Sequence, residues 1–135
     1  RAHEAADPIC GADGALYRVV EYVRDMPHLL AAAELVLCRG GASTLAELAA
    51  VRVPAWVVPY PHHADRHQER NAAQLGSGVR VVDESQLGPL LAGELASVAG
   101  PGGAGERDAM RRALVERIPG DAAQRILQEL RLIAR

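Results

Sequence analysis

Lysine is absent from this chain: all 15 basic residues are arginines, and with 17 acidic residues the formal net charge is −2. No dense basic stripe accompanies the arginines, so the composition argues against a nucleic-acid partner. Cysteine is scarce too. Cys10 and Cys38 lie far apart and form no C-x-x-C motif, which excludes zinc sites of that pattern and a disulfide scaffold. A reducing, cytoplasmic setting is therefore expected.

Long hydrophobic runs are missing as well. No apolar run approaches the ~18 to 20 residues that span a bilayer, and the N-terminal RAHEAADP lacks the apolar core of a signal peptide. The chain starts without an initiator methionine, from which we expect a processed chain or a piece of a longer one. Its 135 residues, 49% of them hydrophobic, are typical of one globular domain that spans 1–135.

Short β-rich runs alternate with longer runs rich in alanine and leucine. Strands are expected at residues 16–23, 34–38, 54–59 and 79–83, and helices at 25–33, 43–51, 67–76, 85–99, 106–117 and 121–134. Asp25 is the expected N-cap of its helix, and the glycine-rich segment 100–105 is expected to be a flexible hinge before the last two helices. The β-α-β-α order predicts an α/β fold, with a parallel sheet and helices on both faces.

Ligands of open α/β sheets bind beyond the carboxyl ends of the strands. At one such end, Arg39, Gly40 and Gly41 lead into a helix, whose N-terminal N–H groups suit a phosphate. The alternative is a tight turn without a ligand. Thr44 and Glu47 fit a capping box, which is the favoured interpretation of those two residues alone. The competing interpretation has Glu47 accept hydrogen bonds from ribose hydroxyls.

A second strand end leads into a polar loop at 60–72, which contains three histidines. The spacing of its side chains matches no common zinc pattern, so no metal is expected. A loop that binds sugar hydroxyls is the preferred interpretation, and a solvated loop without a ligand is the alternative.

Taken together, VRDM, VLCRGGASTLAELAAVRVPAWVVPYPHHADRHQERNA and GVRVVDESQL resemble the C-terminal half of MurG-type enzymes. These enzymes transfer N-acetylglucosamine from UDP-N-acetylglucosamine to a lipid-linked peptidoglycan precursor. The resemblance covers residues 16–90. It implies a Rossmann-like half of a two-domain GT-B glycosyltransferase of family 28, namely the C-terminal domain that binds the nucleotide sugar.

The resemblance also implies roles for individual residues. The backbone of Val23 meets the uracil, Glu47 binds the ribose, and His67 and Gln68 touch the donor sugar. The residues near the diphosphate are Gly41, Ala42, Ser43 and Thr44. Three positions depart from the family, which commonly has serine at 40, a larger apolar residue at 43 and glutamine at 67. The departure at His67 bears on the specificity for N-acetylglucosamine more than on the binding of UDP.

The implied reaction needs no cofactor, because a helix N-terminus and backbone donors stabilise the leaving diphosphate. The partners are a UDP-sugar donor and an N-terminal acceptor domain that supplies the general base, so we expect the isolated chain to be inactive. No catalytic residue is assigned within it. The full-length enzyme is expected at the inner face of the plasma membrane, as a peripheral protein. The alternatives are a GT-B enzyme with another acceptor or sugar, and a non-catalytic module that binds nucleotide sugars.

The C-terminal helix carries an apolar stripe at helical spacing, formed by Ile126, Leu127, Leu130 and Ile133. In the resembled fold a terminal helix crosses back to the other domain. Part of the stripe is therefore expected to be bare in this chain, and to favour a homo-oligomer.

Overall fold

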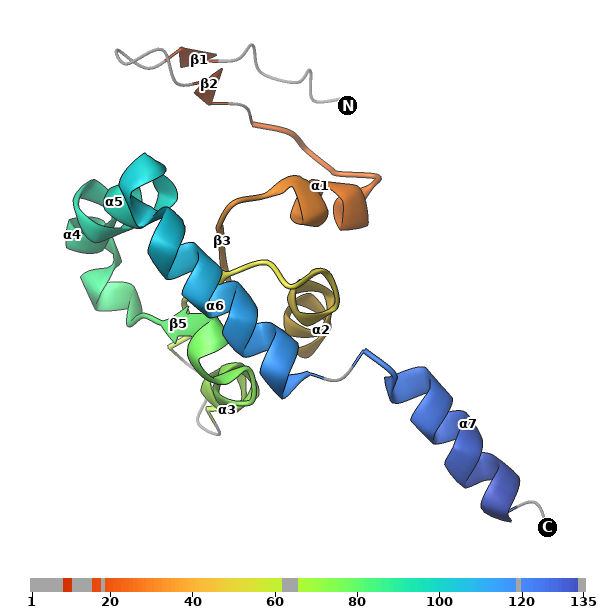
Figure 1. Ribbon diagram of the computed structural model, residues 1–135. Helices are drawn as coiled ribbons and strands as arrows, with labels where there is room; N and C mark the ends of the chain where they lie inside the picture. Colours follow the sequence, from red (N-terminus) through yellow and green to blue (C-terminus); the bar gives the residue numbers. More distant parts are fainter. Residues whose placement is uncertain (1–8, 11–15, 18, 62–65, 119, 134–135) are drawn as a thin grey trace.

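In a computed structural model of the chain, residues 9–10, 16–17, 19–61, 66–118 and 120–133 are described. Their centre is a parallel sheet of three strands, in the order β3 (Val36–Cys38), β4 (Ala55–Val57) and β5 (Val79–Val81). Helices cover both faces of this sheet (Figure 1). The predicted fold class is confirmed.

The middle strand, β4, explains why both faces are covered. It and the residue that follows form an apolar run from Ala55 to Val58, and every side chain in the run is buried. Ala55 and Val57 pack into a core with α1 (Met26–Ala32), α2 (Ala42–Val51) and α3 (His67–Ala73). Trp56 and Val58 point the opposite way, into a second core.

The second core contains Val98 and Met110. They come from α5 (Glu94–Ala99) and α6 (Ala104–Arg117), which follow the short helix α4 (Leu87–Ala92).

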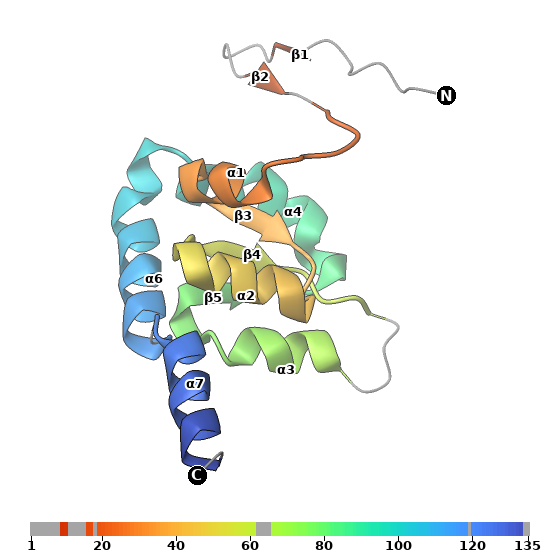
Figure 2. The same ribbon diagram turned by 90° about the vertical axis from the view of Figure 1, so that its right-hand side faces the viewer.

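Helix α6 crosses the sheet at the amino ends of its strands (Figure 2). Arg107 and Arg111 both bind Glu34, which precedes β3. Leu114 lies against Gly78, which precedes β5, so closely that a side chain on Gly78 would collide with it. The carboxyl ends of the strands lie at the opposite edge, where the predicted ligand loops are.

The predicted strand at 16–23 is wrong for most of its length. Only β2 (Leu16–Tyr17) is a strand, and it pairs antiparallel with β1 (Ile9–Cys10), outside the parallel sheet. Val19, Val20 and Tyr22 are exposed. The alternation of apolar residues suits a strand, but a strand needs a neighbour for its hydrogen bonds, and the described residues offer none beyond Tyr17.

The predicted helix at 85–99 is three shorter pieces. A 3-10 turn at Glu84–Gln86 leads into α4, and Gly93 separates α4 from α5. Residues 100–105, expected to be a hinge, contain another 3-10 turn (Pro101–Gly103) and the start of α6. That helix therefore begins two residues earlier than predicted. Motion at this segment stays a prediction.

The chain ends in α7 (Ala122–Ile133), which extends away from the body of the domain (Figure 1). No residue of α7 is buried. The four side chains of the predicted stripe are all more than half exposed.

Candidate functional site

The turn after β3 leads directly into α2 at the carboxyl edge of the sheet. Gly41 is the N-cap of α2, and no side chain in the described part of the chain caps the helix. Ala42, Ser43 and Thr44 form its first turn, where backbone N–H groups have no partner within the helix. The four residues predicted to lie by a diphosphate thus lie at one helix N-terminus, the positive end of the helix dipole.

The two glycines of this turn differ in what surrounds them. A Cβ on Gly40 would lie 2.7 Å from the backbone oxygen of Gln68 and 2.8 Å from its Cβ, so Gly40 allows the turn to contact α3. A Cβ on Gly41 would meet only the hydroxyl of Thr44, at 3.7 Å. Among the described residues, nothing else lies close to this side of Gly41, whereas Gln68 fills the space beside Gly40.

Glu47 does not cap α2, so the capping-box prediction is wrong. Because Gly41 is the N-cap, the position that closes a capping box is Thr44, and Glu47 lies one turn further along the helix. Its side chain is exposed and makes no hydrogen bond or ion pair with the described residues. The carboxylate is therefore free to accept hydrogen bonds from a ligand.

Gln68 lies in the first turn of α3 and reaches back to both neighbouring strand-end loops. Its Oε1 accepts hydrogen bonds from the N–H of Gly40 at 3.2 Å and of Tyr60 at 2.9 Å. His67, which begins the helix, is exposed, and its Nδ1 lies 3.2 Å from the guanidinium of Arg70. The structure therefore brings Gln68 next to the glycine turn, while the contact of His67 and Gln68 with a donor sugar stays a prediction.

Arg39 joins three strand ends, and the sequence analysis assigned it no such role. Its guanidinium donates to the backbone oxygens of Val58 and Pro59, at 3.4 and 3.2 Å. It also binds both carboxylate oxygens of Glu84, at 2.9 and 3.0 Å, and lies 5.7 Å from the centre of the Tyr60 ring. The hydrogen bonds to Glu84 raise the pKa of Arg39 above its ordinary value.

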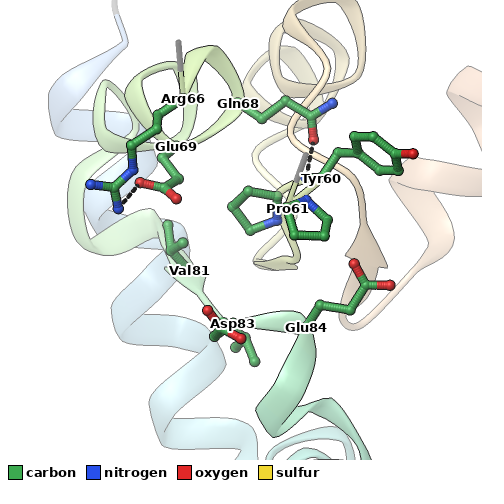
Figure 3. A pocket seen from close by; sticks show the side chains of 10 residues that line it. Tyr60, Pro61, Arg66, Gln68, Glu69, Val81, Asp83 and Glu84 are labelled. Carbon is green, nitrogen blue, oxygen red and sulfur yellow. Dashed lines mark hydrogen bonds and ion pairs between the residues drawn. The ribbon is translucent and has the colours of Figure 1, made fainter. Parts of the chain in front are cut away.

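A pocket of about 390 Å³ opens between the ends of β4 and β5 (Figure 3). Apolar and polar side chains both line it: Pro59, Tyr60, Pro61, Arg66, Gln68, Glu69, Val81, Val82, Asp83 and Glu84. Arg66 pairs with Glu69 across 2.5 Å, and hydrogen bonds from Ser85 lower the pKa of Asp83. The sequence analysis overlooked the loop after β5, although all carboxyl ends of a parallel sheet share one edge.

Val23 does not follow a strand of the parallel sheet, contrary to the prediction. It lies half-buried in the irregular segment before α1, and α1 packs beside α2. Asp25 caps α1 as predicted, because its side chain accepts a hydrogen bond from the N–H of His28. The contact between the Val23 backbone and uracil stays a prediction.

Residues 62–65 of the histidine-rich loop, among them His62, His63 and Asp65, lie outside the described residues. Within the described part, no three His, Cys, Asp or Glu side chains gather in a way that could hold a metal ion. No helix in the same part is long and apolar enough to cross a membrane. The cellular location stays a prediction.

Comparison with known proteins identifies the family of this chain. Residues 3–91 match the model of the glycosyltransferase family 28 C-terminal domain. The chain is 46% identical, over 93 residues, to a transferase of Burkholderia mallei (strain SAVP1). The printed name of that relative is UDP-N-acetylglucosamine–N-acetylmuramyl-(pentapeptide) pyrophosphoryl-undecaprenol N-acetylglucosamine transferase. A protein of the same name from Burkholderia thailandensis is 45% identical over 93 residues. The match covers 67% of this chain but only 24% of either relative.

Two solved structures have a similar fold. The crystal structure of Acinetobacter baumannii MurG matches 83% of this chain and 32% of its own, with a TM-score of 0.67 and 25% identity. The spinosyn forosaminyltransferase SpnP matches 87% of this chain and 30% of its own, with a TM-score of 0.55. At 24% identity, the second likeness concerns the fold alone. The family match covers well over half of the sequence, and this chain belongs to the glycosyltransferase family 28 C-terminal domains, related to MurG.

Proposed function

We propose that the chain is the donor-binding domain of a MurG-like glycosyltransferase. In this proposal it binds UDP-N-acetylglucosamine, and the longer enzyme transfers N-acetylglucosamine to a lipid-linked peptidoglycan precursor. The observation that carries the proposal is the position of Glu47 one turn along α2 from the helix N-terminus. Among the described residues, no side chain caps that N-terminus and none pairs with Glu47. The names of the relatives at 45 and 46% identity support the choice of nucleotide sugar.

The diphosphate is proposed to bind at Gly41, Ala42, Ser43 and Thr44, through backbone N–H groups and the positive end of the helix dipole. Arg39 is the nearest cation along the chain, but Glu84 already neutralises it. Charge that develops on the leaving UDP is then stabilised by preorganised backbone donors. Glu47, which follows on the same helix, accepts hydrogen bonds from two ribose hydroxyls.

The donor sugar is proposed to lie by His67 and Gln68, at the start of α3. Because Gln68 uses its carbonyl oxygen within the protein, only its NH₂ group is left to donate to a sugar oxygen. The acceptor and the general base belong to the proposed longer enzyme. The isolated chain is therefore expected to bind the donor without turning it over.

Isothermal titration calorimetry tests the proposal, with UDP-N-acetylglucosamine, UDP-glucose, UDP and ADP as separate ligands. We expect the two UDP-sugars and UDP to bind, and ADP to bind much more weakly. If UDP-glucose binds as tightly as UDP-N-acetylglucosamine, the domain does not select the acetamido sugar. Equal binding of UDP and ADP, or no binding of UDP, contradicts the proposal.

Turnover is a separate measurement. The chain is incubated with UDP-N-acetylglucosamine and a lipid-linked acceptor, and the release of UDP is followed. We expect no release above that of a protein-free control. Release of UDP at an ordinary enzymatic rate contradicts the proposal that this chain only binds the donor.

A further inference from the structure

Three side chains tie together the loops that leave the carboxyl ends of β3, β4 and β5. We call Arg39, Gln68 and Glu84 the strand-end brace. Gln68 joins the Gly40 turn to Tyr60, and Arg39 joins the same turn to the loop after β4 and to Glu84. These hydrogen bonds link residues that are 8 to 45 positions apart in the chain.

The orientation of the Gln68 amide follows from its partners. Both Gly40 and Tyr60 present N–H donors, so the group that faces them is the carbonyl oxygen, an acceptor. Figure 3 shows this oxygen directed at Tyr60 and the amide nitrogen directed away. The oxygen therefore serves the protein, and only the nitrogen is available to a ligand.

The contact between Gln68 and the glycine turn is close along the backbone as well. The Cα of Gly40 packs so near to Gln68 that a Cβ would lie 2.7 Å from its backbone oxygen. Gly41, the N-cap of α2, follows directly. Any movement of Gln68 is thus transmitted to the residue from which the first turn of α2 begins.

We propose that Gln68 is a positioning residue, whose carbonyl oxygen holds the Gly40–Gly41 turn in the shape that receives a nucleotide diphosphate. This inference rests on the proposed function. Without the brace the turn samples other shapes, and a ligand must order it again on binding, which lowers the affinity. Loss of Gln68 therefore weakens the binding of UDP, which lacks the donor sugar that the amide is proposed to contact.

The binding test compares wild type, Gln68→Ala and Gln74→Ala by calorimetry, with UDP and UDP-N-acetylglucosamine as ligands. Gln74 is the matched control, because it is an exposed glutamine at the C-cap of the same helix, directly after Ala73. We expect Gln68→Ala to lower the affinity for both ligands by about tenfold, because the turn loses two hydrogen bonds. Gln74→Ala is expected to leave both affinities within twofold of wild type.

A weaker affinity for UDP-N-acetylglucosamine alone, with UDP binding unchanged in Gln68→Ala, overturns the proposal. That outcome leaves Gln68 as a sugar contact only. If wild type fails to bind UDP, the proposed function is wrong, and amide exchange in the ligand-free protein decides whether Gln68 holds the turn.

Hydrogen exchange measured by NMR provides that second readout. We expect the amides of Gly40 and Tyr60 to exchange several-fold faster in Gln68→Ala than in wild type, because each loses its acceptor. Gln68→Glu retains an acceptor oxygen and is expected to keep both amides protected. Unchanged exchange of both amides in Gln68→Ala overturns the brace itself.

Discussion

Two exposed glutamates of this domain, Glu34 and Glu47, differ in the ion pairs that they make. Glu34 binds the guanidinium groups of Arg107 and Arg111, at 3.1 and 3.2 Å, and these arginines lower its pKa. Glu47 has no partner among the described residues. The ion pairs of Glu34 contribute to folding stability, whereas the carboxylate of Glu47 is available to bind a ligand. Replacement by glutamine is therefore expected to lower stability at Glu34 and to weaken ligand binding at Glu47.

At Glu47, replacement by glutamine removes the charge but keeps the length and an acceptor oxygen. Because hydrogen bonds to a charged carboxylate are about twice as strong as neutral ones, UDP binding is expected to weaken by roughly tenfold. The Tm of the ligand-free protein is expected to stay nearly the same, since the side chain caps nothing. Calorimetry with UDP and a thermal melt measure the two effects.

Glu116→Gln is the control for that experiment, because Glu116 is an exposed glutamate on α6. It is expected to change neither quantity. Unchanged UDP affinity in Glu47→Gln contradicts the assignment of Glu47 to the ribose.

At Glu34 the expected effect is on stability against pH. Its pKa is lower in the folded state than in the unfolded state, so its stabilisation is complete above the unfolded value, about 4.3, and is lost as the pH falls through the folded value. Wild type should therefore lose more stability than Glu34→Gln between pH 5 and pH 3. Urea denaturation at each pH measures the difference in unfolding free energy between the two proteins. Added salt should reduce this difference, because it screens the charges of the exposed Glu34.

The other carboxylates titrate in both proteins, so only the difference between the two curves reports on Glu34. Parallel curves over this range contradict the assigned ion pairs.

At the scale of elements, the sequence predicted the helices and strands of 34–83 well and those of 84–105 poorly. Helix α2 begins one residue before its predicted start and ends at the predicted residue, because its limits follow from local spacing. The predicted helix at 85–99 is interrupted at Gly93, and the supposed hinge forms a packed turn. The shape of this region depends on how closely α5 and α6 approach.

Gly103, which ends the 3-10 turn between these helices, packs directly against Val98 of α5. A Cβ there would collide with the backbone of Val98, whereas a Cβ on Gly102 would meet nothing within 4 Å. We expect Gly103→Ala to destabilise the domain by about 1 to 3 kcal/mol, the range for overpacking, and Gly102→Ala to have little effect. Chemical denaturation of the two variants tests this, and equal stabilities contradict the close packing of this turn.

At the scale of the whole molecule, α7 presents an apolar stripe that its own domain leaves uncovered. Ile126, Leu127, Leu130 and Ile133 are 61, 54, 56 and 80% exposed. Such a patch favours association, and a second copy of the chain offers an identical stripe for a symmetric pair of helices. We therefore expect the predicted homo-oligomer to form through α7.

Sedimentation velocity over a range of concentrations tests it. We expect wild type to associate as the concentration rises, and Leu130→Arg to remain monomeric because a charge is placed within the stripe. Gln128→Arg is the matched control, since Gln128 is exposed on the same helix outside the stripe. A wild-type protein that stays monomeric at high concentration contradicts this prediction.

The sequence by itself determined the parallel α/β sheet, the cap at Asp25 and the glycine turn that leads into α2. Each of these follows from residues close together in the chain, through hydrophobic spacing and turn chemistry. Only the tertiary structure decided which residues support that turn. Gln68 reaches Gly40 across 28 positions, and Arg39 reaches Glu84 across 45. No local pattern encodes such pairs, because they exist only once β3, β4 and β5 lie side by side and bring their carboxyl ends to one edge.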